Sequence, residues 1–315
     1  MDTSSSKLMR STESLFFSII LPTYNRSYII GETIKSVINQ TYDKWELIVV
    51  DDGSTDNTKE VVAEIKNGDN RIRYIYQENS ERSSARNNGI LNSKGDFICF
   101  IDSDDLFREY HIFKINDAIK SSENLNAIFI TGQSILKSGK IEDLPEERIL
   151  TSAPDFFFTN TIITGRMAIS SKILKEFHFD TDYRISEDTD LWVRISSLYP
   201  DIIQLNCHTL VYRVHDFNSV NPEKYNAYLE RKLTLKKIYN SNKTNLNKNL
   251  VSKTINNCYF GMYRYYKSNG YSFRAFFSML RAIIELPNHR FKEKIYLLMT
   301  SIGIPKKNKS EKNNN

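Results

Sequence analysis

FICFIDSDD, residues 97–105, joins five apolar residues directly to three aspartates within four positions. An apolar run of this length between polar segments is typical of a buried strand. Ligands of parallel α/β sheets bind beyond the carboxyl ends of the strands, which is where these aspartates would fall. The segment therefore predicts an α/β fold with its chemistry at the end of this strand.

The preceding residues alternate between strand and helix patterns. Strands are predicted at 17–22, 47–50 and about 72–76, and helices at 28–39, 57–66 and 82–93. In the first of these helices Ile30, Ile34, Val37 and Ile38 share one face. This β-α-β-α-β order predicts a parallel, doubly wound sheet.

The following residues change in pattern. A helix at about 108–121 and a strand at 126–134 precede an irregular stretch over 139–161, and a helix at 187–199 and a strand at 203–214 come after it. From 226 onward the pattern is helical.

Charge is distributed unevenly along the 315 residues. Residues 226–315 carry 18 Lys and Arg against 4 Asp and Glu, whereas residues 1–225 carry 25 against 34. An acidic part suits a protein that holds metal cations, and a basic part suits contact with phosphate or anionic lipid. We therefore expect the two parts to have different roles.

An apolar stripe falls in the basic part. Its members follow helical spacing, with Arg274 and Arg281 away from it: Phe273, Phe276, Phe277, Leu280, Ile283 and Ile284. Such a stripe most often packs against the rest of a protein, here the acidic part. The alternative is that it lies on a membrane surface.

The sequence carries no targeting or disulfide signal. No apolar run approaches the roughly 18 residues of a membrane-spanning helix, and the N-terminus lacks the apolar block of a signal peptide. Cys99, Cys207 and Cys258 are widely separated, so we expect three reduced and mostly buried thiols. These features predict a cytoplasmic protein.

The three aspartates at 102–105 predict a metal site. Like charges this close repel one another unless a positive group binds them. Mg²⁺ or Mn²⁺ takes oxygen ligands and keeps open positions for the oxygens of a substrate's pyrophosphate. The alternative is that these residues cap a helix beginning near 107, but capping explains one aspartate and not three.

Two further acidic segments have two interpretations each. Asp51-Asp52-Gly53 ends a strand without a GxGxxG or GxxxxGK[ST] sequence, so Asp52 either belongs to a tight turn or accepts a hydrogen bond from a base N–H. Glu187 and Asp188 precede an apolar helix, where the macrodipole favours acids. A carboxylate there is also a suitable general base for an acceptor hydroxyl.

Taken in order, these segments resemble the family-2 glycosyltransferases of GT-A fold. The resemblance covers roughly the first 220 residues and rests on SIILPTYNR (18–26), ELIVVDDGSTDNT (46–58), SSARNNGI (83–90), GDFICFIDSDD (95–105), SEDTDLWVRI (186–195) and VYRVH (211–215). Each piece is weak alone, but their order and spacing are specific. The sequence has no QxxRW segment, which argues against a processive polysaccharide synthase.

The resemblance implies a nucleotide-sugar site at the ends of the first strands. Thr23 and Asp52 would contact the base, usually uracil, and Arg86 would help hold the nucleotide. Pro22 and Tyr24 would shape the base pocket. The full set implied for nucleotide-sugar binding is Pro22, Thr23, Tyr24, Asn25, Asp52, Arg86, Asp102 and Ser103.

The resemblance also implies a metal and a base. Asp102-Ser103-Asp104 matches the DxD element of the family, with Asp104 a ligand of Mn²⁺ or Mg²⁺ and Asp102 or Asp105 touching ribose or metal-bound water. His215 lies where some relatives contact metal or pyrophosphate, although a histidine near a strand end is more often structural. Asp188 would be the general base, and Glu187 would orient the acceptor or that base.

The implied mechanism is a single displacement with inversion. Asp188 would deprotonate an acceptor hydroxyl that attacks the anomeric carbon of a UDP-sugar or a related donor, and the acceptor would rest against residues 162–192. Two segments, Asn79–Ser84 and Phe177-His178, depart from the glycines that are common in the family. These departures predict that the two loops differ in local shape from those of the family.

The resemblance implies a GT-A catalytic domain at 16–220, divided into a nucleotide-sugar half (16–105) and an acceptor half (106–220). The remaining parts are expected to be a flexible N-terminus at 1–15, a helical basic region at 221–304 and a disordered tail at 305–315. The basic residues of 226–315 would suit a lipid-linked acceptor or the inner face of the membrane, in capsule, lipopolysaccharide or glycoprotein assembly. Alternative functions are a sugar nucleotidyltransferase, a non-catalytic sugar-nucleotide-binding subunit and, from basicity alone, a nucleic-acid-binding protein, which we do not expect.

Overall fold

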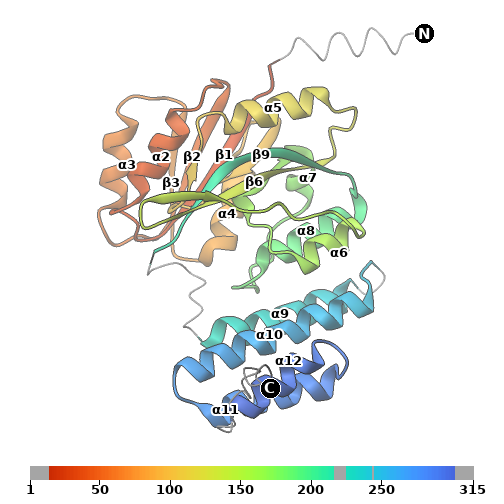
Figure 1. Ribbon diagram of the computed structural model, residues 1–315. Helices are drawn as coiled ribbons and strands as arrows, with labels where there is room; N and C mark the ends of the chain where they lie inside the picture. The colour runs from red at the N-terminus through yellow and green to blue at the C-terminus, as the bar shows by residue number, and fades with distance from the viewer. Residues whose placement is uncertain (1–13, 216–224, 243–244, 302–315) are drawn as a thin grey trace, which may run out of the picture. The chain divides into compact units, whose positions relative to one another are not determined.

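The computed structural model describes residues 14–215, 225–242 and 245–301 of the chain. The chain divides into two compact units, residues 1–215 and 216–315 (Figure 1). Residues 1–13 of the N-terminal segment expected at 1–15, the expected domain boundary at 220/221 and the expected tail at 305–315 lie outside the described residues.

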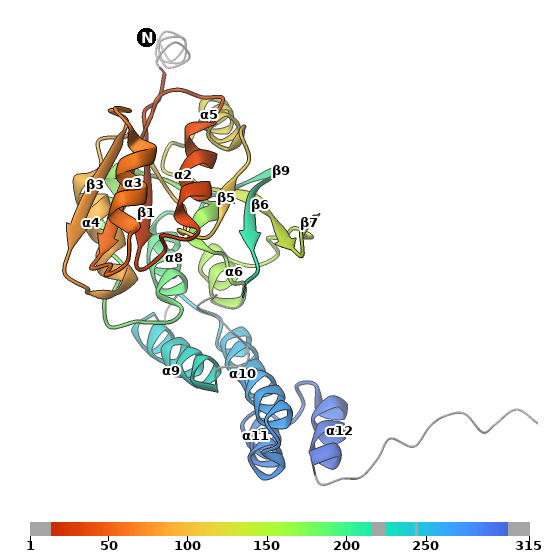
Figure 2. The ribbon, with the colours of Figure 1, turned by 90° about the vertical axis from the view of Figure 1, so that its left-hand side faces the viewer.

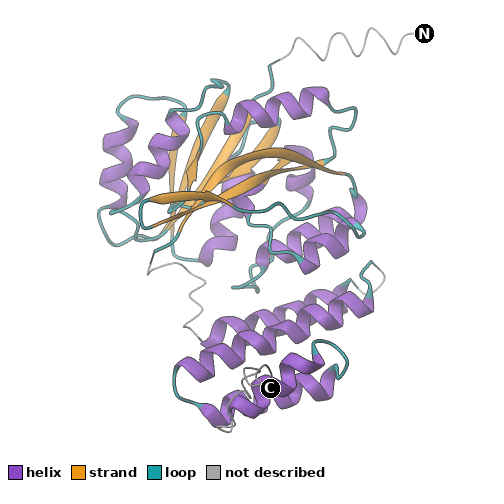
Figure 3. Ribbon diagram, viewed as in Figure 1, coloured by secondary structure: helices purple, strands orange, loops and turns teal. Residues whose placement is uncertain are grey.

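The first unit is an α/β fold built on one sheet (Figure 3). The described strands of this sheet run in the order β3-β2-β1-β4-β8-β6-β9-β5, with β7 paired to β6. Neighbours among β1 to β4 are parallel, as are β6 and β9, whereas β8 runs antiparallel to both β4 and β6. The strands are β1 Phe17–Thr23, β2 Trp45–Asp52, β3 Ile72–Gln77, β4 Phe97–Phe100, β5 Leu106–Phe107, β6 Ile128–Lys137, β7 Lys140–Asp143, β8 Met167–Ser170 and β9 Ile202–Arg213.

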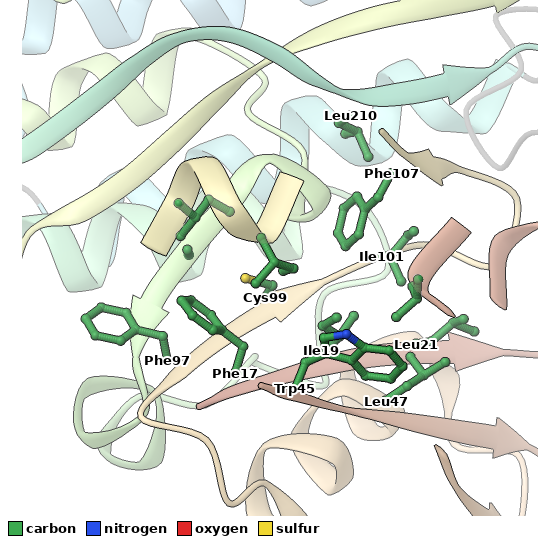
Figure 4. Close-up of a cluster of buried hydrophobic side chains, with 14 of the residues drawn as sticks. Phe17, Ile19, Leu21, Trp45, Leu47, Phe97, Cys99, Ile101, Phe107 and Leu210 are labelled. Atoms are coloured by element: carbon green, nitrogen blue, oxygen red, sulfur yellow. The ribbon is translucent and has the colours of Figure 1, made fainter. Parts of the chain in front are cut away.

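Helices cover both faces of this sheet. The helices of the first unit are α2 Ile30–Ile38, α3 Thr58–Lys66, α4 Glu81–Asn92, α5 His111–Ser121, α6 Ala153–Thr159, α7 Ser171–Glu176 and α8 Glu187–Leu198, with a 3₁₀ turn at Thr164–Arg166. Because successive strand side chains point to opposite faces, Ile19 and Leu47 join the cluster that includes α2 and α5, whereas Ile48 and Val50 contact Ala85 of α4. Figure 4 shows the larger cluster. The expected parallel, doubly wound arrangement of β1 to β4 is confirmed.

The α4 helix packs very closely on β1. A Cβ atom built on Gly89 would lie 2.4 Å from Cγ2 of Ile20. Only glycine fits at this contact, which fixes the distance of α4 from the sheet. That distance sets the position of Arg86, one turn earlier on the same helix.

The structure differs from the expected elements after residue 100. The helix expected from 108 begins at His111, because Leu106 and Phe107 instead pair with β9 as strand β5. No described helix begins near 107, so the interpretation of residues 102–105 as a helix cap is wrong. The stretch expected to be irregular at 139–161 contains β7 and the short helix α6. Pairing with the distant strand β9, which local periodicity does not report, accounts for β5. Strand β7 instead pairs with the preceding strand β6 in a hairpin.

The second unit is helical in its described residues, as expected from 226 onward. It comprises α9 Tyr225–Ser241, α10 Lys248–Ser268, α11 Ser272–Glu285 and α12 Phe291–Ser301, which Figure 2 shows from the side. Its core joins Tyr259 and Tyr263 of α10 to Met279 of α11. Across the described parts of both units, none of the helices is long and apolar enough to cross a bilayer.

A buried histidine in α5 makes stability depend on pH. The His111 ring is fully buried, stacks on Phe107 with ring centroids 3.6 Å apart and places Nδ1 2.7 Å from Thr209 Oγ1. Burial lowers the pKa of His111 to about 3. The unfolded chain therefore takes up this proton first as the pH falls below about 6.5, and stability is lost between that pH and the folded pKa.

We expect His111 to lower the free energy of unfolding by about 2 kcal/mol between about pH 6.5 and about pH 5. Urea denaturation of the native chain and of His111→Asn at both pH values measures it. The variant should be less stable at neutral pH but should lose less on acidification. Equal losses in the two chains would contradict this assignment.

Candidate functional site at the acidic edge of the sheet

The acidic residues gather beyond the carboxyl ends of three neighbouring parallel strands. Thr23 ends β1 and pairs in register with Asp51, which is followed by Asp52 at the end of β2. The turn of residues 102–105 follows β4, the neighbour of β1 on its other side. The fold thus brings the three segments to one edge, which is where parallel α/β sheets bind ligands.

Asp51 and Asp52 have different surroundings. The buried Asp51 accepts hydrogen bonds from the Ser54 amide at 2.8 Å and from the Tyr74 hydroxyl at 2.6 Å, so it holds the turn. Oδ1 of Asp52 accepts from Gln77 Nε2 at 2.7 Å and from the Ser80 amide at 2.9 Å. Oδ2 of Asp52 accepts no hydrogen bond from the described residues. Asp52 therefore keeps one acceptor oxygen for a ligand.

A second polar atom beside this turn lacks a partner. Thr23 is 3% exposed, and its Oγ1 has no hydrogen-bond partner among the described residues. A buried hydroxyl without a partner loses its hydration at a cost, so such atoms often mark ligand sites. Thr23 and Asp52 lie on adjacent strands, as a shared base pocket requires.

The loop after β1 is fixed to the loop after β2. Asn25 lies in the left-handed region with φ 52°, and its Oδ1 accepts a hydrogen bond from the Thr55 amide at 2.7 Å. Its own amide donates to Ser54 Oγ at 2.9 Å. Pro22 is buried in β1, while Tyr24 is 48% exposed at the edge. Asn25 thus positions this loop, and the ring of Tyr24 lies exposed at the edge of the sheet.

Gly53 is required by the turn after β2. It has φ +82°, and a Cβ atom at this position would lie 2.8 Å from the Asn79 nitrogen. Any residue other than glycine would be strained at such a φ, and its Cβ atom would also collide with Asn79. The close approach allows the segment after β3 to contact Asp52.

A buried arginine joins two of the predicted acidic segments. Arg86 is 3% exposed; its Nη2 donates to Asp102 Oδ1 at 2.8 Å and its Nη1 donates to Glu187 Oε1 at 2.9 Å. The guanidinium carbon also lies 5.3 Å from the centroid of the Phe179 ring. Burial alone would lower the pKa of Arg86, but Asp102 and Glu187 raise it, so the group stays charged. Arg86 therefore brings the start of α8 to the turn after β4.

Asp104 and His215 lie side by side. The distance from Asp104 Oδ2 to His215 Nε2 is 3.0 Å, and Arg26 Nη2 is 3.6 Å from the same oxygen. Two adjacent ligands of an octahedral ion, each about 2.1 Å from it, are also about 3 Å apart. A carboxylate and an imidazole suit Mn²⁺, so this pair fits such an ion. Within the described residues no group of three or more His, Cys, Asp or Glu could hold a metal ion by itself.

Arg213 of β9, which the sequence motifs did not single out, holds the acidic turn after β4. Its backbone amide donates to Asp105 Oδ1 at 3.1 Å, its Nε donates to the Asp104 carbonyl and its Nη2 donates to Thr33 Oγ1 at 2.9 Å. Thr33 Oγ1 in turn donates to the carbonyls of Ser103 and Asp105. Arg213 lies within the quoted VYRVH segment, but only His215 was singled out there.

Asp105 points into the protein. It is 1% exposed, and burial together with the charges of Asp102 and Asp104 raises the pKa of its carboxyl, while Arg213 opposes the rise. Its surroundings are those of a residue that shapes the turn. Asp104 and Asp102 are the more accessible members of the trio, with side chains 13% and 35% exposed.

The acids at the start of α8 are also distinct from one another. Glu187 is 5% exposed and paired with Arg86, and Asp190 accepts from Arg194 Nε at 2.8 Å. Asp188 is partly exposed, and its Oδ1 accepts from the Thr189 amide at 2.7 Å. Ser186, the residue before the helix, has φ 63°. The helix thus begins at a sharp turn that places three acids in three environments.

The chain is similar in sequence to known glycosyltransferases. The family model described as Glycosyl transferase family 2 matches residues 18–174. An uncharacterised glycosyltransferase of Rickettsia typhi is 32% identical over 225 residues, which cover 68% of this chain and 69% of that protein. A GalNAc(5)-diNAcBac-PP-undecaprenol beta-1,3-glucosyltransferase of Campylobacter jejuni is 28% identical over 284 residues, covering 84% and 86%.

Other relatives are much longer than this chain. An uncharacterised glycosyltransferase of Rickettsia felis is 35% identical over 184 residues, which cover 57% of this chain. The matched part is 30% of that relative's own length.

Solved structures share the fold. TarS residues 1–349 of S. aureus, in complex with UDP-GlcNAc, match with a TM-score of 0.61 at 18% identity, covering 91% of this chain and 90% of that one. A mannosyltransferase of Pyrobaculum calidifontis, in complex with GDP-Man and Mn²⁺, matches with a TM-score of 0.60 at 15% identity, covering 93% and 88%. This chain therefore belongs to glycosyl transferase family 2, a family of enzymes, and has the GT-A type of α/β fold.

Proposed function

We propose that this chain transfers a sugar, with inversion, from a nucleotide-diphosphate donor to a hydroxyl of a glycan or lipid-linked acceptor. The observation that carries the proposal is the Arg86 bridge, with Asp102 at 2.8 Å on one side and Glu187 at 2.9 Å on the other. It joins the turn that would hold the donor's diphosphate to the helix that would hold the general base. The nucleotide-sugar donor and the acceptor would therefore bind at the same edge of the sheet.

The donor base would lie between β1 and β2. Asp52 Oδ2 would accept the N3–H of uracil, Thr23 Oγ1 would gain the partner it lacks, and Tyr24 would cover the base. Pro22 and Asn25 would shape the pocket, and Ser103 would lie under the donor. A UDP-sugar is our first choice because uracil presents one N–H donor between two carbonyl acceptors. Residues 16–105 would thus form the nucleotide-sugar half of the catalytic domain.

The divalent ion would be held by Asp104 and His215, with Asp102 next to it. Bound there, Mn²⁺ or Mg²⁺ would neutralise the charge that develops on the departing diphosphate. Arg26 lies near enough to Asp104 to contact the same phosphates. We assign Asp105 to shaping the turn, with Arg213 as its partner.

Asp188 would act as general base. Its carboxylate takes the proton of the acceptor hydroxyl as the oxygen forms a bond to the anomeric carbon and the bond from that carbon to the diphosphate oxygen breaks. Glu187, held by Arg86, would fix the start of α8 and so the direction of Asp188. The acceptor would rest on residues 106–220, at the segment 162–192.

The acceptor class and setting are proposed from the relatives. The Campylobacter jejuni relative is named for an acceptor on undecaprenyl diphosphate, and it covers most of this chain. An acceptor of that kind would place the enzyme on the cytoplasmic side of a membrane, in the assembly of capsule, lipopolysaccharide or a related surface glycan. The basic residues of 226–315 would favour an anionic membrane surface.

Binding of UDP tests the donor site without turnover. Isothermal titration of the native chain with UDP should show binding that is stronger with Mn²⁺ than with a chelator. Asp104→Ala should weaken the Mn²⁺-dependent binding of UDP by at least about tenfold. Mutation of a residue that only hydrogen-bonds a metal ligand already lowers metal affinity or activity by about 10–100-fold.

Asp117→Ala is the matched control, because Asp117 is an exposed carboxylate on α5 away from this edge. It should bind UDP as the native chain does. Equal binding by native chain and Asp104→Ala, with and without Mn²⁺, would contradict the assignment of Asp104.

A further inference from the structure

Helix α11 carries an exposed apolar face within the second unit. Phe273 is 76% exposed, Phe277 is 42% exposed and Ile284 is 71% exposed. These positions, with the partly buried Leu280 between them, follow one stripe of the helix at helical spacing. Isolated apolar side chains are common on surfaces, but a continuous stripe of this kind is not.

The opposite face of α11 packs into the core of the second unit. Ala275, Met279 and Ala282 are fully buried and belong to the core shared with α10. The end of the helix is fixed as well, because the buried Lys294 of α12 donates to the carbonyls of Ala282 at 2.7 Å and Leu286 at 2.6 Å. The buried face of α11 is therefore made by two alanines and a methionine, and the aromatic residues Phe273 and Phe277 lie on the outside.

Aromatic rings are concentrated on the exposed stripe. The rings of Phe273 and Phe277 have centroids 4.7 Å apart, and Phe276 lies 5.5 Å from Phe277. Aromatic and branched side chains on one face are typical of helices that lie at the boundary of headgroups and acyl chains.

Positive charge borders the stripe. Arg274 and Arg281 are exposed and lie along the same flank of α11. The single acid of the helix, Glu285, accepts a hydrogen bond from the Tyr259 hydroxyl. Residues 226–315 as a whole carry 18 Lys and Arg against 4 Asp and Glu. This charge complements anionic lipid and disfavours the pairing of two copies of the unit.

We propose that the Phe273–Ile284 stripe of α11 docks this chain onto an anionic membrane surface, with the stripe entering the headgroup region and Arg274 and Arg281 contacting lipid phosphate. The helix would lie in the plane of the surface. The inference rests on the membrane contact of the proposed function, names the helix and the side chains that would make it, and does not depend on catalysis.

Sedimentation with vesicles tests the docking. The native chain should bind phosphatidylcholine vesicles that contain phosphatidylglycerol and should bind pure phosphatidylcholine several-fold more weakly. The triple variant Phe273→Ser, Phe277→Ser, Ile284→Ser should lower the partition coefficient by at least about tenfold, because it removes most of the apolar area. The double variant Arg274→Ala, Arg281→Ala should weaken binding to the anionic vesicles only.

The matched control changes three exposed leucines of the first unit to serine, namely Leu91, Leu150 and Leu198, which are 66%, 81% and 69% exposed. It should bind vesicles as the native chain does. Circular dichroism and Mn²⁺-dependent UDP binding, measured on every variant, distinguish a lost surface from a lost fold or a failed donor site.

Three results would overturn the proposal. The first is native-like vesicle binding by the folded triple variant, and the second is equal binding of the native chain to anionic and neutral vesicles. The third is that the native chain is a dimer in sedimentation velocity, the triple variant is a monomer, and neither chain binds vesicles. That result would assign the stripe to contact with a second copy of the chain.

Discussion

Asp188→Asn should reduce sugar transfer by about 10²–10⁴-fold, the range that general-base catalysis contributes. An amide is nearly the same size as a carboxylate but cannot accept the acceptor's proton at neutral pH. The hydrogen bond from the Thr189 amide to Oδ1 can persist in the variant, so α8 should start where it does now. Binding of UDP should be unchanged, because Asp188 would contact the acceptor and not the nucleotide.

Asp190→Asn is the control that tests whether the acidic residues at the start of α8 serve only to stabilise the fold. Asp190 is 3% exposed and paired with Arg194, so its change should lower the free energy of unfolding while transfer per folded molecule is kept. If the acids only complement the helix macrodipole, both variants would lose about 0.3–1 kcal/mol and neither would lose transfer. Full activity of Asp188→Asn would remove Asp188 from the mechanism.

Arg86→Met should lower the free energy of unfolding by about 3–5 kcal/mol, because it leaves the buried Glu187 without its positive partner. It should also stop transfer, since the start of α8 would no longer be tied to Asp102. Urea denaturation and a transfer assay on the folded fraction measure the two effects separately. Arg184→Met is the control: its ion pair with Glu81 joins side chains 75% and 52% exposed, so the change should be within about 0.5 kcal/mol.

The double variant Arg86→Met, Glu187→Met separates packing from positioning. Replacing both members of a buried pair with apolar side chains often restores stability. We expect the double variant to regain most of the lost free energy of unfolding and to remain inactive. Recovered transfer in the double variant would mean that the bridge only stabilises the fold.

The sequence was sufficient for the parallel half of the sheet. The apolar runs at 17–22, 47–50 and 97–101 and the helical periodicity between them are local signals, and β1, β2 and β4 confirm them. The acids at the strand ends were visible for the same reason, because a buried strand that ends in carboxylates is a local pattern.

Contacts between distant residues could not be predicted in the same way. Arg86 was expected beside the nucleotide, but its bonds to Asp102 and Glu187 cross 16 and 101 positions of the chain. Arg213 reaches the Asp104 carbonyl across 109 positions. Strand β5 depends on its pairing with β9 and has only two residues of its own.

The stripe on α11 shows the limit of periodicity. The helical spacing of Phe273, Phe277 and Ile284 identified a common face, but it could not say whether that face is inside or outside. The buried side is made by Ala275, Met279 and Ala282, small or flexible residues that allow close packing of helices. An apolar face that is not needed for the core is visible only once the core is known.

The most direct test of the account is the release of nucleoside diphosphate from a panel of UDP-, GDP- and dTDP-sugars with Mn²⁺ and a lipid-linked or soluble glycan acceptor. The native chain should turn over one donor, and a chelator, Asp104→Ala and Asp188→Asn should each reduce that release by at least about 10²-fold. If every donor remains intact although UDP binds tightly, or if release persists in both variants, the proposed transferase site is wrong.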